Sequence, residues 1–305
     1  MNPSYTRRQL SKGVLALAAG LLLPSGLSAQ AICAAPHSSP SLQPSGSIGT
    51  IEPLTGWLQL TYFRQRSTEF YNQLGDLQPL LANTAITTNS VFVTSGFGLT
   101  EGLEVWAQLP FHDLSSTSSA GDADRRGIGD PRFAVRVGSE LFGLSIPLMV
   151  RGGVKFAGTN FPVDATIIPL SEGQTDWELS LESGYFISGA FPLQVIGSFG
   201  YRWRKLNGSN GRKPGDERFA YVSVGGPQKG WRWNLAFEGL WGSAPVDHGL
   251  KLTGSKRKLI QIDPSIAYQV GGNEVQLSMT LPLLGRNLAA ANAVTVGFYI
   301  PWALP

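Results

Sequence analysis

The chain has 305 residues, of which 42% are hydrophobic and only 15% are charged, whereas about 25% of the residues of a typical soluble domain are charged. Glycine is unusually frequent, at 37 residues. This composition excludes a disordered chain, a coiled coil and a highly charged nucleic-acid-binding protein. After the first 31 residues, no uncharged apolar run approaches the roughly 18 residues of a membrane-spanning helix. A polytopic helical membrane protein is therefore excluded as well.

Residues 1–31 have the pattern of an export signal. A basic segment (7–12) precedes an apolar stretch (13–23), and Ala29 and Ala31 form a small-x-small cleavage site. Cleavage after Ala31 would remove three of the 24 basic residues and none of the 21 acidic ones, so the mature chain would carry no net charge. The sequence pI of about 9.0 is therefore no argument for nucleic-acid binding.

The export route and the anchoring of the chain have alternatives. Residues 6–12 also resemble a twin-arginine signal, which exports folded proteins and would argue against a membrane barrel. The other interpretation is an ordinary basic segment that directs general secretion. Cys33 is the only cysteine, and Ile32 stands where a lipoprotein signal requires a small residue, which argues against lipidation.

A Ser-, Pro- and Gly-rich segment (32–54) reads as a flexible periplasmic leader. After it, the chain divides into twelve runs in which apolar and polar residues alternate. A period of two predicts β-strands, because a helix with a period of 3.6 would mix the two faces. We expect strands at 56–66, 88–99, 103–113, 130–141, 145–158, 174–187, 192–205, 215–227, 231–243, 257–270, 274–286 and 291–303. The alternation is too weak in 56–66 and 215–227 to assign their two faces.

The connections between these runs alternate in length. Short turns are expected at 100–102, 142–144, 188–191, 228–230 and 271–273. Longer connections are expected at 67–87, 114–129, 159–173, 206–214 and 244–256, and the remaining one, 287–290, is short. Short periplasmic turns and long outer loops are typical of outer-membrane barrels. We therefore predict an all-β fold over 55–305, a single antiparallel transmembrane β-barrel of about twelve strands.

A soluble β-sandwich would also show alternation. The runs exceed the mean soluble strand of about 5–6 residues, however, and aromatic residues gather at their ends, as in the two interface girdles of a membrane barrel. Those near the long connections are Phe111, Phe156, Trp177, Trp203 and Trp241. Those near the turns or the C-terminus are Tyr185, Trp231, Trp233, Tyr268 and Trp302. The expected location is the outer membrane of a Gram-negative-type bacterium, with membrane lipid, a small-molecule solute and the barrel-assembly machinery as partners.

Three segments carry a resemblance to a known family. Residues 95–111 read SGFGLTEGLEVWAQLPF, residues 127–132 read GIGDPR, and residues 173–176 read GQTD. They resemble the strand-turn-strand signature, the G-x-G-D segment and the later G-x-x-D of the outer-membrane β-barrel family linked to the meta-pathway of phenol degradation. The resemblance spans roughly 55–303. It implies passage of small hydrophobic or aromatic compounds and supplies no catalytic residues.

The chain departs from that family at two places. Residues 156–158 read FAG where the family usually has Pro-Thr-Gly. The C-terminus reads WALP, whereas barrel proteins commonly end on an aromatic residue that the assembly machinery recognises. The second departure concerns the assembly route more than the fold.

Alternation predicts which side chains face the lumen. The charged set contains Arg132, Arg136, Arg151, Lys155, Asp176, Glu178, Glu182, Arg202 and Arg204. Further lumen-lining candidates are Glu104, Trp106, Gln108, Asn234 and Glu238. Opposite charges on neighbouring strands would pair across the wall. The result is either a polar filter for a solute or a salt-bridged plug, and Trp106 either stacks on an aromatic solute or fills space.

No motif predicts catalysis or a cofactor. His37, His112 and His248 lack the neighbours of a metal site. Residues 207–212 read NGSNGR and resemble the H-x-S-N-G-R segment of outer-membrane phospholipase, but Asn207 replaces the histidine that would activate Ser209. We therefore expect a transporter that is not an enzyme. The alternatives are a structural or surface barrel with a filled lumen and, less favoured, a phospholipase-like enzyme.

Overall fold

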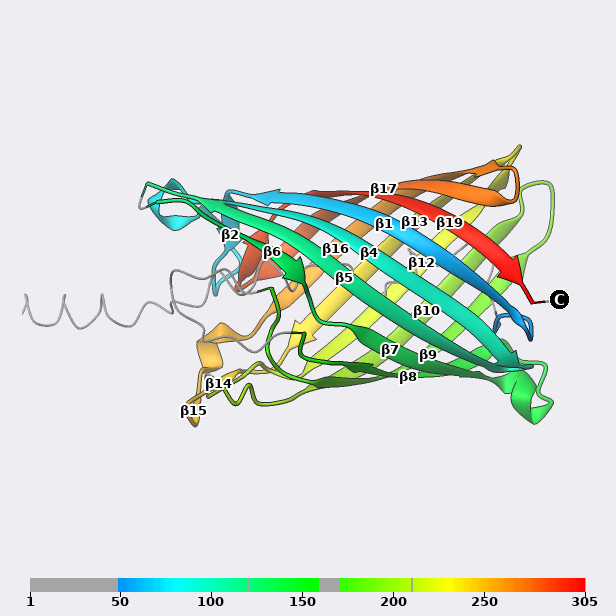
Figure 1. The fold of residues 1–305 in the computed structure, drawn as a ribbon, viewed down its shortest axis with the longest axis horizontal. Coiled ribbons are helices and arrows are strands. Elements are labelled where there is room, and N and C mark those ends of the chain that lie inside the picture. The colour runs from blue at the N-terminus through cyan, green and yellow to red at the C-terminus, as the bar shows by residue number, and fades with distance from the viewer. Residues whose placement is uncertain (1–48, 120, 159–169, 210, 305) are drawn as a thin grey trace, which may run out of the picture.

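The computed structural model describes residues 49–119, 121–158, 170–209 and 211–304. They form a closed antiparallel barrel of twelve strands (Figure 1). The barrel strands are β1 (Thr55–Ser67), β4 (Ala85–Thr100), β5 (Leu103–Thr117), β7 (Arg132–Gly138), β8 (Leu148–Lys155), β9 (Asp176–Ile187), β10 (Leu193–Arg204), β12 (Glu217–Gln228), β13 (Trp231–Gly242), β16 (Lys258–Val270), β17 (Asn273–Arg286) and β19 (Ala293–Ala303). Each pairs with its neighbours in the chain, and β19 pairs with β1 to close the barrel.

The connections carry the shorter elements. The short strands are β2 (Glu69–Tyr71), β3 (Leu77–Pro79), β6 (Ala123–Ile128), β11 (Arg212–Lys213), β14 (Val246–Asp247), β15 (Leu250–Lys251) and β18 (Leu288–Ala290). The helical elements of the described residues include three 3-10 turns, η3 (Leu81–Asn83), η4 (Ser139–Phe142) and η5 (Thr253–Ser255). No helix among the described residues is long and apolar enough to cross a membrane.

All twelve predicted strands are confirmed, with three local corrections. The run 130–141 contains only the seven residues of β7, because the chain turns into η4 at Ser139 and Gly143 adopts a left-handed φ of 68°. The run 145–158 shortens to the eight residues of β8. The expected loop 114–129 is largely strand, since β5 continues to Thr117 and β6 pairs with it.

Together β6 and β7 occupy one position in the barrel, interrupted between Ile128 and Arg132. Both strands pair with β5. Ile128 of β6 lies opposite Phe111, and Arg132 of β7 lies opposite Gln108. Pro131 at the interruption has no N–H to donate to a ladder. Gly129 is required there, because a Cβ on it would lie 2.3 Å from Nε2 of His112.

The two faces of the wall differ in chemistry, as a membrane barrel requires. The outer face is apolar at mid-depth, where Leu181 is 50% exposed and Phe199 58%. All ten aromatic residues of the expected girdles are exposed, between 37% for Trp233 and 68% for Tyr185. The inner face is mostly polar, with small apolar clusters such as Phe63, Phe92 and Ala293. The structure also assigns the two faces of β1, which the sequence left open. Its inner face carries Trp57, Gln59, Thr61, Phe63 and Gln65.

The two ends of the barrel differ as well. The C-terminus lies at one end, where Ala303 pairs with Thr55 of β1. The labels β2, β14 and β15 lie at the opposite end (Figure 1). The first is therefore the periplasmic end and the second the extracellular end. The expected signal peptide (1–31), its Ala29–Ala31 cleavage site and residues 32–48 of the leader lie outside the described residues.

Candidate functional site

The strand register places like charges side by side in the lumen wall. Between β7 and β8, Arg136 lies opposite Arg151, and Arg132 lies opposite Lys155. Like charges directly opposite one another destabilise a sheet. They are offset by carboxylates from the flanking strands, because β5 contributes Glu104 next to Arg136 and β9 contributes acidic residues on the other side.

The periplasmic part of this network centres on Arg136. Its side chain is 2% exposed and pairs with Glu104, which is 0% exposed, and with Glu182, whose Oε2 lies 2.9 Å from Nε of Arg136. Trp106 donates its indole N–H to Oε1 of Glu104 at 2.8 Å. The Trp106 ring also packs edge-on against Trp57, with 5.1 Å between the ring centroids. Trp106 is thus held in the wall by these contacts.

The central part links β8, β9, β10 and β12. Arg151 lies 2.9 Å from Glu178, and its Nε lies 3.3 Å from Glu182. Glu178 is shared, because Arg202 approaches its Oε2 to 2.7 Å. Arg202 then reaches Glu217 of β12 at 2.8 Å. Each charged group here contacts at least one opposite charge, so the charges form a continuous chain of ion pairs.

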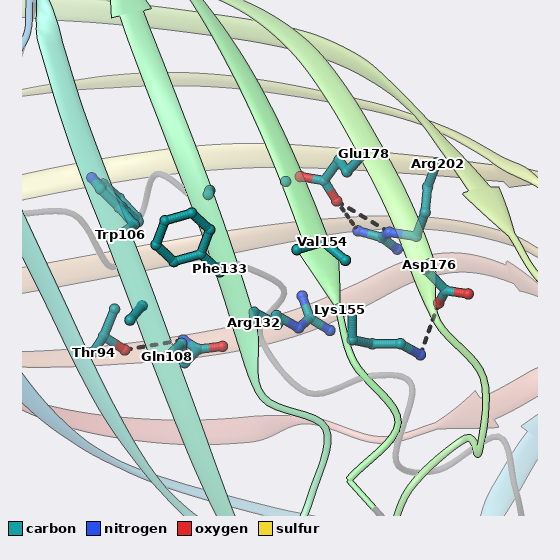
Figure 2. Close-up of a pocket in the computed structure, with 13 residues that line it drawn as sticks. Thr94, Trp106, Gln108, Arg132, Phe133, Val154, Lys155, Asp176, Glu178 and Arg202 are labelled. Atoms are coloured by element: carbon teal, nitrogen blue, oxygen red, sulfur yellow. Dashed lines mark hydrogen bonds and ion pairs between the residues drawn. The ribbon is translucent and has the colours of Figure 1, made fainter.

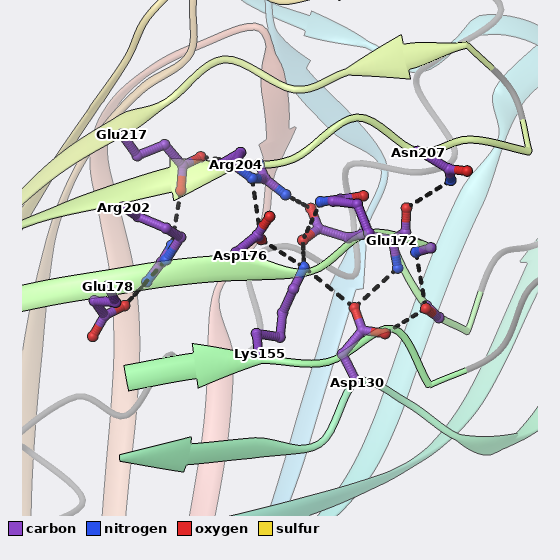
Figure 3. Close-up of polar contacts among 12 residues, drawn as sticks. Asp130, Lys155, Glu172, Asp176, Glu178, Arg202, Arg204, Asn207 and Glu217 are labelled. Atoms are coloured by element: carbon purple, nitrogen blue, oxygen red, sulfur yellow. Dashed lines mark hydrogen bonds and ion pairs between the residues drawn. The ribbon is translucent and has the colours of Figure 1, made fainter. Parts of the chain in front are cut away.

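The extracellular part ties the wall to the connection between β8 and β9 (Figure 3). Lys155 lies 2.8 Å from Asp176 and 3.3 Å from Asp130, and it also pairs with Glu172. Arg204 pairs with Glu172 and contacts Asp176 at 3.3 Å. Asp130 further accepts the backbone N–H groups of Gly158 at 2.8 Å and Glu172 at 3.0 Å. The carboxylate of Asp130 therefore fixes both the cation and the chain around it.

Sequence reasoning missed four members of the network, namely Asp130, Glu172, Glu217 and Arg257. Asp130 had a signal, because it is the Asp of the G-x-G-D segment. Glu217 belongs to the run 215–227, whose faces the alternation could not assign. Glu172 lies in a connection, where no periodicity indicates a direction, and Arg257 is the first residue of the expected run 257–270 but lies just before β16.

The remaining candidates lie elsewhere on the inner face. Gln108 donates to Oγ1 of Thr94 at 3.0 Å. Glu238 accepts a hydrogen bond from Gln261 at 2.6 Å, and half-buried Asn234 lies on the same face of β13. Asn234 and Glu238 are on β13, the strand next to β12, whose Glu217 belongs to the ion-pair network.

A pocket opens against the charged wall (Figure 2). It is partly open, and its empty volume of about 490 Å³ includes open solvent. Its polar and charged lining residues are Thr94, Gln108, Arg132, Lys155, Asp176, Glu178 and Arg202, and the others are Trp106, Ala107, Phe133, Ala134, Gly153 and Val154. A Cβ added to Gly153 would meet atoms no closer than 3.5 Å. The small side chains at 134 and 153 therefore leave room between the ion pairs.

The chain that precedes β1 reaches the periplasmic part of the network. The backbone N–H of Ile51 donates to Oε2 of Glu104 at 2.6 Å. Leu54 donates to the carbonyl of Gly98 at 2.9 Å. Gly98 permits this approach, since a Cβ there would lie 2.3 Å from the carbonyl oxygen of Glu52. Residues 49–54 are thus fastened to β4 and β5 at the periplasmic end of the barrel.

The segment that resembles phospholipase forms a turn. The side chain of Asn207 accepts the N–H of Ser209 at 2.9 Å and donates to the carbonyl of Glu172 at 3.0 Å. His112 shares a 2.7 Å hydrogen bond with Ser90, and His248 contacts its neighbour Asp247. His37 lies outside the described residues. Within the described residues, no group of three or more His, Cys, Asp or Glu residues is arranged to hold a metal ion.

Comparison with known proteins supports the fold. No protein-family model matches the sequence, and no curated protein matches it. An outer-membrane channel from Pseudomonas putida F1 superposes with a TM-score of 0.67 at 15% identity, over 85% of this chain and 100% of the other. The translocator domain of the autotransporter NalP from Neisseria meningitidis gives 0.48 at 10% identity, over 85% and 90%. The monoaromatic hydrocarbon channel CymD gives 0.38 at 8% identity, over 83% and 89%.

The structural match to the outer-membrane channel and the chemistry of the two faces of the wall indicate the same kind of barrel. The chain has the fold of an outer-membrane channel, and its apolar outer band with two aromatic girdles has the pattern of a lipid-facing barrel surface. The chain is therefore an outer-membrane β-barrel protein with a charged, ion-paired lumen.

Proposed function

We propose that this barrel passes small hydrophobic or aromatic compounds across the outer membrane. In this proposal the pocket beside the ion-pair network is a binding site along the route through the lumen. The pocket is the observation that carries the proposal. Its lining combines apolar with charged and polar side chains, which is the mixture usual for small-molecule sites. Ala134 and Gly153 contribute small apolar surface to its lining, and Trp106 contributes an aromatic ring. The resemblance of 95–111 and 127–132 to the phenol meta-pathway family supports the same solute class.

In this proposal the charged candidates line the lumen and shape the pocket without binding the solute by net charge. Arg136, Arg151 and Arg202 each face a carboxylate within 3 Å. Their fields therefore largely cancel over a short distance. Residues 49–54 narrow the periplasmic mouth, because Ile51 is fastened to Glu104. The result is a narrow channel with weak ion selectivity.

The test fills the pocket without touching a charge. In Gly153→Leu, the added side chain projects into the pocket from β8. The matched control is Gly152→Leu, because Gly152 is on the opposite face and a Cβ there meets nothing within 4 Å. In planar bilayers, we expect Gly153→Leu to lower the single-channel conductance by about half or more and to abolish current blocking by phenol. Gly152→Leu should behave as the unmodified protein.

Two results would contradict the proposal. Equal conductance and equal phenol block in both variants would show that the pocket is not on the path. If the unmodified protein and a variant lacking residues 32–50 are both silent in the bilayer, although their heat-dependent gel mobility is intact, the lumen is filled. The barrel would then be a structural or surface protein that presents its long loops.

A further inference from the structure

A row of basic and aromatic side chains crosses the outer face of the barrel near the extracellular end. The register joins Arg218 of β12 to Trp241 of β13, Trp241 to Lys258 of β16, and Lys258 to Arg286 of β17. Residues in one register row share a face, and Trp241 is 41% exposed on the outer face. Arg218 and Arg286 are exposed, and Lys258 is half-buried.

The three cations of this row have no acidic partner among the described residues. Glu217, next to Arg218, faces the lumen and pairs with Arg202. Asp216, just before β12, accepts the backbone N–H of Arg204 at 2.8 Å and lies 3.6 Å from Lys213. Lys258 and Arg286 lie directly opposite each other. Such a like-charge pair destabilises a sheet unless an anion lies between the two cations.

The wall beside the row is shaped for acyl chains. The next register row toward the membrane centre contains Ala220, Gly239, Ile260 and Leu284. A Cβ on Gly239 would lie 2.3 Å from the Trp241 ring. The Trp241 ring therefore lies over Gly239, on the side of the membrane centre. It does not fill the space between Arg218 and Lys258. Apolar surface thus continues directly below the cations.

We propose that this row binds a phosphorylated glycolipid of the outer leaflet. Its phosphates would contact Arg218, Lys258 and Arg286, while its acyl chains follow the outer faces of β12, β13 and β16. The row spans three strand spacings, about 14 Å, which a disaccharide with a phosphate at each end can bridge. Arginine and lysine are the side chains that bind phosphate oxygens best. The site lies on the lipid face and is independent of solute passage through the lumen.

The experiment measures binding of lipid A to the purified barrel in detergent by native mass spectrometry. We expect the apparent Kd for diphosphorylated lipid A to rise about fivefold in Lys258→Gln and about a hundredfold when Arg218, Lys258 and Arg286 are all replaced by Gln. The matched control is Lys229→Gln, which removes one exposed cation from the periplasmic turn between β12 and β13 and should leave the Kd unchanged. Dephosphorylated lipid A should bind all variants equally.

Several outcomes would overturn the proposal. One is that Lys258→Gln binds diphosphorylated lipid A as the unmodified protein does. Another is that Lys229→Gln loses as much affinity as Lys258→Gln. Displacement of lipid A by an equal amount of phosphatidylglycerol, or by millimolar inorganic phosphate, would show a surface for any anion. Heat-dependent gel mobility reports folding of each variant, and the single Lys258→Gln variant decides the question if the triple variant does not fold.

Discussion

Replacing Arg136 by Met tests whether the lumen network is a dry, paired structure. The Arg136 side chain is 2% exposed, and those of its partners Glu104 and Glu182 are 0% and 3% exposed. Removing one partner of a buried pair costs about 3–5 kcal/mol, because the opposite charge remains buried without compensation. We expect the lower end, about 3 kcal/mol. Glu182 keeps Arg151 at 3.3 Å, and Glu104 keeps the N–H groups of Trp106 and Ile51.

The companion variant removes the orphaned charge as well. Arg136→Met combined with Glu104→Gln leaves no unpaired carboxylate at this point, and such replacements of a whole pair are often neutral. We therefore expect the free energy of unfolding to return to within about 1 kcal/mol of the unmodified protein. Urea unfolding in lipid vesicles, followed by tryptophan fluorescence, measures both values.

The result that would refute this reasoning is a loss of less than about 1 kcal/mol in Arg136→Met alone, the usual range for solvent-exposed pairs. Water would then reach Glu104 in place of the guanidinium, and the network would be a solvated lining. A double variant that is no more stable than Arg136→Met would show that the loss comes from packing against Trp106 and Met149 instead of from charge.

The remaining predictions concern the wall, a loop anchor and the closed fold. Leu181→Arg should destabilise the folded barrel in vesicles by about 2–4 kcal/mol, because it places a cation on the lipid face at mid-depth. The control Leu181→Ala should cost less. Equal losses in the two variants would mean that this face of β9 does not contact lipid. Asp130→Ala should speed proteinase K cleavage between β8 and β9, because the N–H groups of Gly158 and Glu172 lose their acceptor. Asp130→Asn keeps an acceptor oxygen, so its cleavage rate should lie between those of Asp130→Ala and the unmodified protein. Unchanged digestion would show that other contacts hold this connection. Unheated and boiled samples should migrate differently on a detergent gel, because a closed barrel stays folded in mild detergent; identical mobility, with recovery in the soluble periplasm, would favour folded export.

Local chemistry explains why the sequence was sufficient for the strands and the inner face. Period-two alternation requires no knowledge of partners, so Glu104, Arg136 and Glu182 could be placed on one face from their positions alone. Alternation fails where the chain bends. Period-two alternation does not reveal where β7 ends or that β6 is a separate strand. The need for glycine at 129 likewise depends on His112 of β5, which lies elsewhere in the chain.

The identity of each ion pair was decided only by the tertiary structure. Alternation predicts that Arg202 points inward, but the register with β9 and β12 determines that it bridges Glu178 and Glu217. Asp130 and Glu172 meet at Lys155 because two connections converge at one end of the barrel. The outer row of Arg218, Lys258 and Arg286 is likewise invisible in the sequence, where these residues stand far apart. For Arg202 and for the outer row the physical reason is the same: the shear between neighbouring strands sets which side chains meet, and that shear is fixed only when the barrel closes.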